Sequence, residues 1–281
     1  MTVPSIELND DTTIPQLGFG VFQVEPAETA VVTRQALEVG YRHLDTAQMY
    51  GNEEGVGQGV RESGLDRDEL YITTKLNNGY HRPDDARAAF DDSLKKLGLD
   101  RVDLFLIHWP LPTQYDGDFV STWQTLVELR DSGRARSIGV SNFQPAHLDR
   151  IVEETGVVPA INQIEVHPFF TNEDARAANA RHNVATEAWS PIARGKVVGN
   201  PVVEEIAARL ERTPAQVALR WHLQRGDIVF PKSTKVERMR ENFGVFDFEL
   251  AEADVAALSG LDQGEDGRTG PNPDTFDMIP D

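Results

Sequence analysis

The sequence contains no cysteine, and this absence removes several kinds of chemistry at once. Disulfide bonds, thiolate nucleophiles and cysteine-based metal sites are all excluded. The seven histidines do not replace them, because they are scattered and none forms the i, i+4 pair that is typical of a zinc-binding helix. The sequence therefore predicts a protein that holds no metal.

Long apolar stretches and a leader are also missing. No uninterrupted apolar run approaches the roughly 18–20 residues of a membrane-spanning helix. The first residues lack the basic and apolar regions of a signal peptide. The hydrophobic fraction of 40% is ordinary for a globular protein. We therefore expect a cytoplasmic protein that does not bind membranes.

Basic residues are scarce. The chain has 27 basic and 46 acidic residues, which gives a formal net charge of −19, and only six of the basic residues are lysine. No basic stripe could match the phosphates of a nucleic acid, so nucleic-acid binding is disfavoured. The acidity has two interpretations. The protein is an ordinary acidic cytosolic protein, or its acidity is a halophilic adaptation to molar salt. At molar salt the Debye length is only about 3 Å, so repulsion among surface carboxylates is screened.

The chain does contain a regular alternation of strand-like and helix-like segments. Short β-branched runs end near Gly20, Asp45, Lys75, His108, Ser141, Glu165, Ala188 and Phe230. Helical patterns cover 27–39, 53–63, 83–97, 120–131, 145–154, 172–181, 202–210, 213–224 and 236–245. Eight strands alternating with helices over about 250 residues predict an α/β protein with a (β/α)8 TIM barrel.

Segments outside this alternation predict additions to the barrel. Residues 5–8 and 12–14 read as an N-terminal β-hairpin, 251–261 as an extra C-terminal helix, and 262–281 as a polar tail. A doubly wound sheet is the competing fold, but Gly18 and Gly20 are not followed by the third glycine of a dinucleotide-binding turn. No stretch resembles a linker, so we expect a single domain over 1–281.

Polar side chains fall at or just after the ends of successive predicted strands. Asp45, Lys75 and His108 lie at such ends, and Tyr50 follows Asp45 by five residues. In a parallel barrel these ends open onto one face, so the side chains should meet there. A lysine close to Tyr50 would lower the phenol pKa and make it a better proton donor, while Asp45 would pair with the buried lysine. Each residue taken alone could instead be an ordinary core or half-buried residue.

Three longer patterns carry a resemblance to a known family. They are residues 40–47 with 50–53, residues 136–143, and residues 231–234 with Arg238, Glu241 and Asn242. In this order and over most of the barrel, they resemble the signatures of the aldo-keto reductase family. Residues 213–224 and 245–248 are most similar to its short bacterial members of the 2,5-diketo-D-gluconate reductase type.

The resemblance implies an NADPH-dependent oxidoreductase that reduces aldehydes or ketones to alcohols. Tyr50 would be the general acid, Lys75 held by Asp45 would lower its pKa, and His108 would orient the carbonyl. An NADPH-binding sensor or partner module of the same fold is the alternative. A barrel isomerase or lyase without nicotinamide would leave the basic residues between 232 and 238 unexplained.

The resemblance also assigns cofactor residues. Ser141, Asn142 and Gln163 match those that bind the nicotinamide carboxamide, and Trp189 matches the aromatic residue that stacks on the ring. The remaining matches serve the pyrophosphate or its ribose (Ser190), the adenosine 2′-phosphate (Lys232, Ser233 and Arg238, with Lys235 beside them) and the adenine (Glu241 and Asn242). Asn142 could equally cap a helix, and the basic residues could be a solvated helix start.

The substrate pocket is predicted from fewer residues. Phe22 and Trp109 would form apolar walls beside His108. Many relatives have Trp where this chain has Asn77, which makes one wall polar. With a short loop at 111–119, this predicts an open site for small polar carbonyls, such as α-keto aldehydes, keto acids or keto sugars. The resemblance to this family also implies a monomer.

Overall fold

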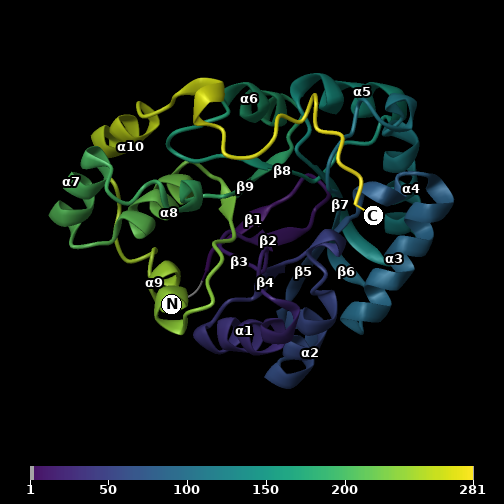
Figure 1. Cartoon of the computed structure of the whole chain (residues 1–281), viewed down its shortest axis with the longest axis horizontal. Helices are drawn as coiled ribbons and strands as arrows, with labels where there is room; N and C mark the ends of the chain where they lie inside the picture. The colour runs from purple at the N-terminus through teal and green to yellow at the C-terminus, as the bar shows by residue number, and fades with distance from the viewer. Residues whose placement is uncertain (1–2, 281) are drawn as a thin grey trace.

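Eight parallel strands form one sheet that is wrapped into a barrel (Figure 1). The structure is a computed structural model and describes residues 3–280. The strands are β3 (Phe19–Gly20), β4 (His43–Asp45), β5 (Tyr71–Leu76), β6 (Val102–Ile107), β7 (Ala135–Ser141), β8 (Ile161–Glu165), β9 (Ala185–Trp189) and β10 (Ile228–Val229). Each pairs in parallel with its neighbour in the chain, so all carboxyl ends lie at one mouth. The predicted (β/α)8 barrel is confirmed.

The barrel closes between its first and last strands along a short seam. Leu17 and Val229 form an isolated parallel bridge. The Gly18 amide donates to the Val229 carbonyl at 2.7 Å, and the Val229 amide donates to the Gln16 carbonyl at 3.0 Å. A Cβ on Gly20 would lie 2.7 Å from the Phe230 carbonyl oxygen, so a larger residue would push the two strands apart.

Helices surround the barrel. They are α1 (Pro26–Val39), α2 (Glu53–Ser63), α3 (Pro83–Leu97), α4 (Val120–Asp131), α5 (Pro145–Thr155), α6 (Glu173–Arg181), α7 (Pro201–Leu210), α8 (Pro214–Gln224), α9 (Val236–Phe243) and α10 (Glu252–Ser259). Several begin on proline, whose fixed φ suits the first turn. The last two end earlier than predicted, at Phe243 and Ser259. The dihedral angles of Gly244 are no longer helical, whereas Gly260 keeps right-handed helical angles at the end of its helix. Single 3-10 turns are η1 (Gln48–Tyr50), η2 (Arg67–Glu69), η3 (Asn78–Tyr80), η4 (Tyr115–Gly117), η5 (Ala193–Gly195) and η6 (Gly264–Gly267).

The predicted hairpin is present and packs against the amino ends of the barrel strands. Strands β1 (Ser5–Glu7) and β2 (Thr13–Pro15) pair antiparallel. Leu8 and Ile14 join a buried apolar cluster inside the barrel with Tyr71, Leu104 and Ile161. This end of the barrel is therefore filled by side chains, and chemistry is left to the opposite mouth.

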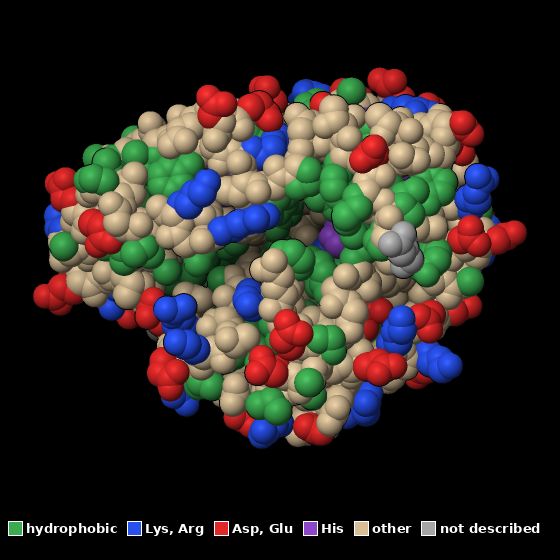
Figure 2. All heavy atoms as spheres, viewed as in Figure 1, with side chains coloured by type: hydrophobic (Ala, Val, Ile, Leu, Met, Phe, Trp, Pro, Cys, Tyr) green, Lys and Arg blue, Asp and Glu red, His purple; other side chains and the backbone are tan. Residues whose placement is uncertain are grey.

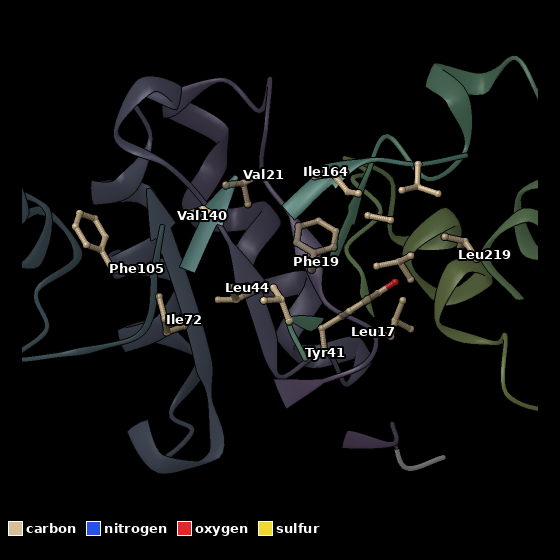
Figure 3. Close-up of a cluster of buried hydrophobic side chains, with 14 of the residues drawn as sticks. Leu17, Phe19, Val21, Tyr41, Leu44, Ile72, Phe105, Val140, Ile164 and Leu219 are labelled. Carbon is tan, nitrogen blue, oxygen red and sulfur yellow. The ribbon is translucent and has the colours of Figure 1, made fainter. Parts of the chain in front are cut away.

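A larger apolar cluster fills the space between the strands and the helices (Figure 3). Phe19 and Tyr41 pack with ring centroids 5.4 Å apart. The Tyr41 hydroxyl donates to the Met239 carbonyl at 3.0 Å, which ties helix α9 to the barrel. The positions of the strand ends are thus fixed by packing on their outer side.

The chain after α10 crosses the barrel at the carboxyl-end mouth (Figure 1). Phe276 packs on Trp109 with centroids 4.2 Å apart, and the Asn78 amide donates to the Met278 carbonyl at 2.9 Å. The predicted tail is therefore an ordered strap; its final residue, Asp281, lies outside the described residues. Within residues 3–280, no helix combines the length and apolarity needed to cross a bilayer.

Candidate active site

The four polar residues predicted to meet do meet at the carboxyl-end mouth. Asp45 ends β4, Lys75 lies near the end of β5, His108 directly follows β6, and Tyr50 ends η1. The Lys75 ammonium donates to both Asp45 carboxylate oxygens at 2.7 and 2.8 Å and to the Thr46 carbonyl at 2.9 Å. It also lies 3.4 Å from the Tyr50 hydroxyl. A buried ammonium, its counter-ion and a phenol are therefore in direct contact.

Two further side chains pack around Tyr50. The His108 ring stands edge-on to the Tyr50 ring, with centroids 5.7 Å apart, and Phe22 packs at 5.0 Å from it. Phe22 is half exposed, whereas Trp109 is buried under Phe276. Phe22 thus packs on Tyr50, and Trp109 directly follows His108 in the chain.

The turn that carries Tyr50 is held from several directions. Asn52 is fully buried, and its amide donates to the Val21 carbonyl at 2.9 Å and the Val24 carbonyl at 3.2 Å. Its oxygen accepts from the Thr46 hydroxyl at 3.0 Å. Asn52 therefore ties the Tyr50 turn both to the loop that bears Phe22 and to the residue whose carbonyl binds Lys75.

The net shift of the Tyr50 pKa is opposite to the one expected. Burial raises the pKa of Tyr50 to about 12, although Lys75 acts to lower it. Lys75 does act to lower the pKa of Tyr50, as predicted. The burial of the Tyr50 hydroxyl outweighs this effect, and burial could not be judged from the sequence alone.

The partners of Tyr50 are shifted as well. Burial works to lower the pKa of Lys75, but Asp45 and Tyr50 outweigh it and the pKa rises, which keeps the ammonium charged. Burial raises the pKa of Asp45 against the opposing effect of Lys75. Burial, with a smaller effect of Lys75, holds the pKa of His108 well below its usual value. His108 is therefore a neutral imidazole at the pH of the cell.

The residues predicted for the nicotinamide lie side by side across β7, β8 and β9. The Ser141 hydroxyl donates to the Gln163 carbonyl at 2.8 Å. The Asn142 amide donates to the His108 carbonyl at 2.9 Å and to the Ser141 hydroxyl at 3.1 Å, and its oxygen accepts from the Trp189 indole at 2.8 Å. Asn142 has positive φ, 64°, and it does not cap α5, whose cap position is Gln144. The half-buried Trp189 is thus fixed in orientation by the residue that follows β7.

The predicted phosphate-binding residues lie at the start of α9. Lys232, Lys235 and Arg238 are exposed, and none of the three has a carboxylate within ion-pair distance among residues 3–280. The buried Ser233 hydroxyl accepts from the Lys235 amide at 3.0 Å and so shapes this turn. Figure 2 shows a hollow in this face with a histidine inside it and Lys or Arg side chains on its rim.

Several other residues predicted to bind the cofactor or line the pocket are buried or already hydrogen-bonded within the protein. The Glu241 carboxylate accepts from the Thr213 hydroxyl at 2.7 Å, and Asn242 is buried. Asn77 caps the start of η3, and its side-chain oxygen accepts from the Gly79 amide at 2.9 Å. Ser190 directly follows β9 with φ of 51°. The side chain of Asn77 therefore stabilises the turn at the start of η3.

Two buried carboxylates were missed by sequence reasoning. Glu187, in β9, accepts from the Gln163 amide at 2.8 Å. Glu165, at the end of β8, accepts from the Thr269 and Gly270 amides at 2.7 and 3.0 Å and anchors the C-terminal strap. A glutamate within a predicted barrel strand was the available signal in both cases, since such a group needs a partner when it is buried.

Fold and site together define a barrel enzyme whose carboxyl-end mouth carries a buried Lys–Asp pair, a phenol and a neutral imidazole. Comparison with known proteins gives the family. The profile of the Aldo/keto reductase family matches residues 16–263. The chain belongs to the aldo/keto reductase family.

Relatives of known name extend over nearly the whole chain. The protein named methylglyoxal reductase DkgA from Yersinia pestis is 48% identical over 276 residues, which cover 97% of both chains. A Mycolicibacterium smegmatis protein named aldo-keto reductase is 47% identical over 275 residues, 98% of both chains. A crystal structure of a Gox0644 mutant in complex with NADPH superposes with a TM-score of 0.94 at 45% identity, and covers 99% of this chain and 100% of the other.

Proposed function

We propose that the protein reduces small, polar aldehydes and ketones to alcohols with Tyr50 as the general acid. It is an NADP-dependent oxidoreductase and its cofactor is NADP(H). The observation that carries the proposed role of Tyr50 is the contact of its hydroxyl with the Lys75 ammonium, which is held by Asp45. Tyr50 is an acid that keeps its proton at neutral pH, and it is in contact with that ammonium.

The residues present fit the cofactor. Lys232, Lys235 and Arg238 are three exposed cations that lie close together in the chain and have no ion-pair partner among residues 3–280. They would bind a phosphate ester through charge-assisted hydrogen bonds. The indole face of Trp189, fixed by Asn142, would stack on a planar ring. Ser141 and Gln163 lie beside it with polar groups for a carboxamide.

When bound, the reduced nicotinamide supplies the hydride for the carbonyl carbon. His108, as a neutral imidazole, would hold the carbonyl oxygen close to Tyr50. As negative charge develops on that oxygen, Tyr50 would give up its proton, and Lys75 would stabilise the phenolate that remains. A phenol with a pKa of about 12 is still a stronger acid than an alcohol, whose pKa is close to the roughly 15.7 of water. The proton transfer is therefore downhill despite the burial of Tyr50.

The walls of the mouth support small polar substrates. Phe22 and Trp109 form apolar walls, while Asn77 places an amide where a large aromatic wall would otherwise narrow the site. The relatives named methylglyoxal reductase carry that name for a small α-keto aldehyde, which fits such a site.

The test is a panel of small carbonyls, followed by the loss of NADPH absorbance, with the wild type and the Tyr50→Phe variant. We expect Y50F to lower kcat by roughly 10²- to 10⁴-fold, the usual contribution of a general acid, with the affinity for NADPH retained. Tyr80→Phe, at an exposed tyrosine on η3, is the matched control and should leave kcat unchanged. A Y50F variant as active as Y80F would disprove the assigned acid.

A further inference from the structure

Glu187 is a buried carboxylate inside the barrel that the proposed chemistry does not use. It lies in the middle of β9 and has no solvent-exposed surface. One oxygen, Oε2, accepts from the Gln163 amide at 2.8 Å. The other, Oε1, has no hydrogen-bond donor within residues 3–280 and lies 3.5 Å from His43 Nε2. An unpaired carboxylate oxygen in a dry interior is unfavourable, so a second function would explain its presence.

Glu187 and Asp45 share one amide group. Gln163 Nε2 donates one hydrogen to Asp45 Oδ2 and the other to Glu187 Oε2, both at 2.8 Å. Because both partners are carboxyl groups, the amide is oriented with its nitrogen toward the barrel interior and its oxygen away from it. Asp45 Oδ2 also accepts from Lys75 at 2.8 Å. A continuous set of hydrogen bonds therefore runs from Glu187 through Gln163 and Asp45 to the ammonium beside Tyr50.

We propose that Glu187 is a positioning residue of the reductase site: it fixes the Gln163 amide and sets the charge of the buried group that contains Asp45 and Lys75. The proposal rests on the proposed function, because its effect reaches the reaction through Tyr50. Glu187 itself does not touch the reacting atoms.

The charge of this buried group depends on whether Glu187 carries a proton. The titratable groups that face it come from three elements: Asp45 and His43 of β4, Lys75 and Tyr71 of β5, and Tyr50 of η1. Burial lowers the pKa of His43 to about 3, so this histidine is neutral and offers no positive charge. Burial and then Asp45 raise the pKa of Glu187 to about 8.

At neutral pH Glu187 is therefore a neutral acid, and the charges of Lys75 and Asp45 balance. Above pH 8 its ionisation adds a negative charge, and this charge is one of the causes that raise the pKa of Tyr50 and weaken it as a proton donor. Carbonyl reduction should consequently slow as Glu187 loses its proton.

The activity test compares three variants over about pH 6 to pH 10. Glu187→Gln keeps an acceptor for Gln163 but cannot ionise; it should retain most of kcat at neutral pH and lose the inflection near pH 8. Glu187→Leu removes the acceptor and should lower kcat by roughly tenfold to a hundredfold at every pH. The control is Asp103→Asn, at a buried barrel carboxylate that accepts hydrogen bonds from Arg67 and the Ile72 amide. Its profile should keep the wild-type inflection.

Infrared spectroscopy gives a readout that needs no turnover. The wild type minus E187Q difference spectrum should show the C=O stretch of a protonated carboxylic acid at pH 6 and its loss on titration through pH 8. Absence of that band at pH 6, or superimposable pH profiles of kcat for wild type and E187Q, would overturn the proposal. If E187L does not fold, these two comparisons still decide it. If the wild type shows the band but reduces no carbonyl, the proposed function is refuted, while the conclusion that Glu187 is protonated still holds.

Discussion

At the residue scale, the site depends on an ion pair that is shielded from water. Lys75 and Asp45 have at most 1% of their side-chain surface exposed. The ammonium makes bonds to both Asp45 oxygens and to the Thr46 carbonyl, and these offset the loss of hydration. Such a pair contributes little net stability, but either partner left alone would be an uncompensated buried charge.

This asymmetry gives a prediction for Lys75→Met. Loss of the ammonium should lower the free energy of unfolding by about 3–5 kcal/mol, because Asp45 remains buried without a counter-ion. The double variant Lys75→Met with Asp45→Asn should recover a large part of that loss. Urea unfolding of the wild type, both single variants and the double variant measures this coupling. Additive single effects, with no recovery in the double variant, would contradict it.

Sequence reasoning found the residues whose position follows from the strand pattern alone. Asp45, Lys75 and His108 each lie at or next to the end of a strand, and parallel strands bring such ends together whatever their separation in the chain. Glu187 was missed because its partner Gln163 lies 24 residues away and the inward direction of its side chain depends on strand register. The net pKa shift of Tyr50 was misjudged for a similar reason, since burial is a property of the packed chain.

At the element scale, helix α2 depends on glycine for its distance from α3. A Cβ on Gly57 would lie 2.1 Å from the Leu97 carbonyl oxygen and 2.6 Å from its carbon. Both are backbone atoms at the end of α3, so they cannot rotate away as a side chain could. Helix α2 directly follows the turn of Tyr50, and its position therefore affects the site.

Gly57→Ala sets two effects against each other. Alanine favours the helix by about 1 kcal/mol over glycine, whereas overpacking against backbone costs about 1–3 kcal/mol. Because the contact is far below any normal separation, we expect overpacking to win and the urea midpoint to fall. The neighbouring exposed residue gives the control, Gln58→Ala, which should stay within about 0.5 kcal/mol of the wild type. A G57A variant more stable than the wild type would show that α2 can move freely away from α3.

Helix boundaries were predictable where the local chain fixes them. Proline at the first turn marked the starts of α3 and α5, and glycine with positive φ marked the end of α3 at Gly98. The short 3-10 turns and the path of the C-terminal strap were not predicted. The strap is held by Glu165 and Trp109, which are distant in sequence, so nothing local indicates where it lies.

At the scale of the whole molecule, the excess of acidic residues produces electrostatic repulsion among the carboxylates of the surface. We propose that this acidity is an adaptation to high salt. We also propose that the protein is a cytoplasmic monomer. Raising KCl from about 0.1 to about 1 M shortens the Debye length from about 10 to about 3 Å. It also weakens exposed pairs such as Arg34–Glu38, but each of these is worth at most about 1 kcal/mol.

Repulsion should dominate this balance because the net charge is −19. The urea midpoint is therefore expected to rise between 0.1 and 1 M KCl, to the extent that screening removes the repulsion. The control is a triple variant, Glu28→Gln, Glu205→Gln and Glu252→Gln, at exposed sites that form no ion pair within residues 3–280; its rise should be smaller. An unchanged wild-type midpoint would remove the halophilic interpretation.

The seam between β3 and β10 has a consequence for synthesis on the ribosome. The bridge at the seam joins Leu17 to Val229, so the barrel cannot close until residue 229 of the 281 has been translated. At roughly 5–20 residues per second, Leu17 waits about 10 to 40 s for its partner. During that interval the nascent chain exposes an unpaired strand edge, which is the kind of surface that chaperones shield and that aggregation exploits.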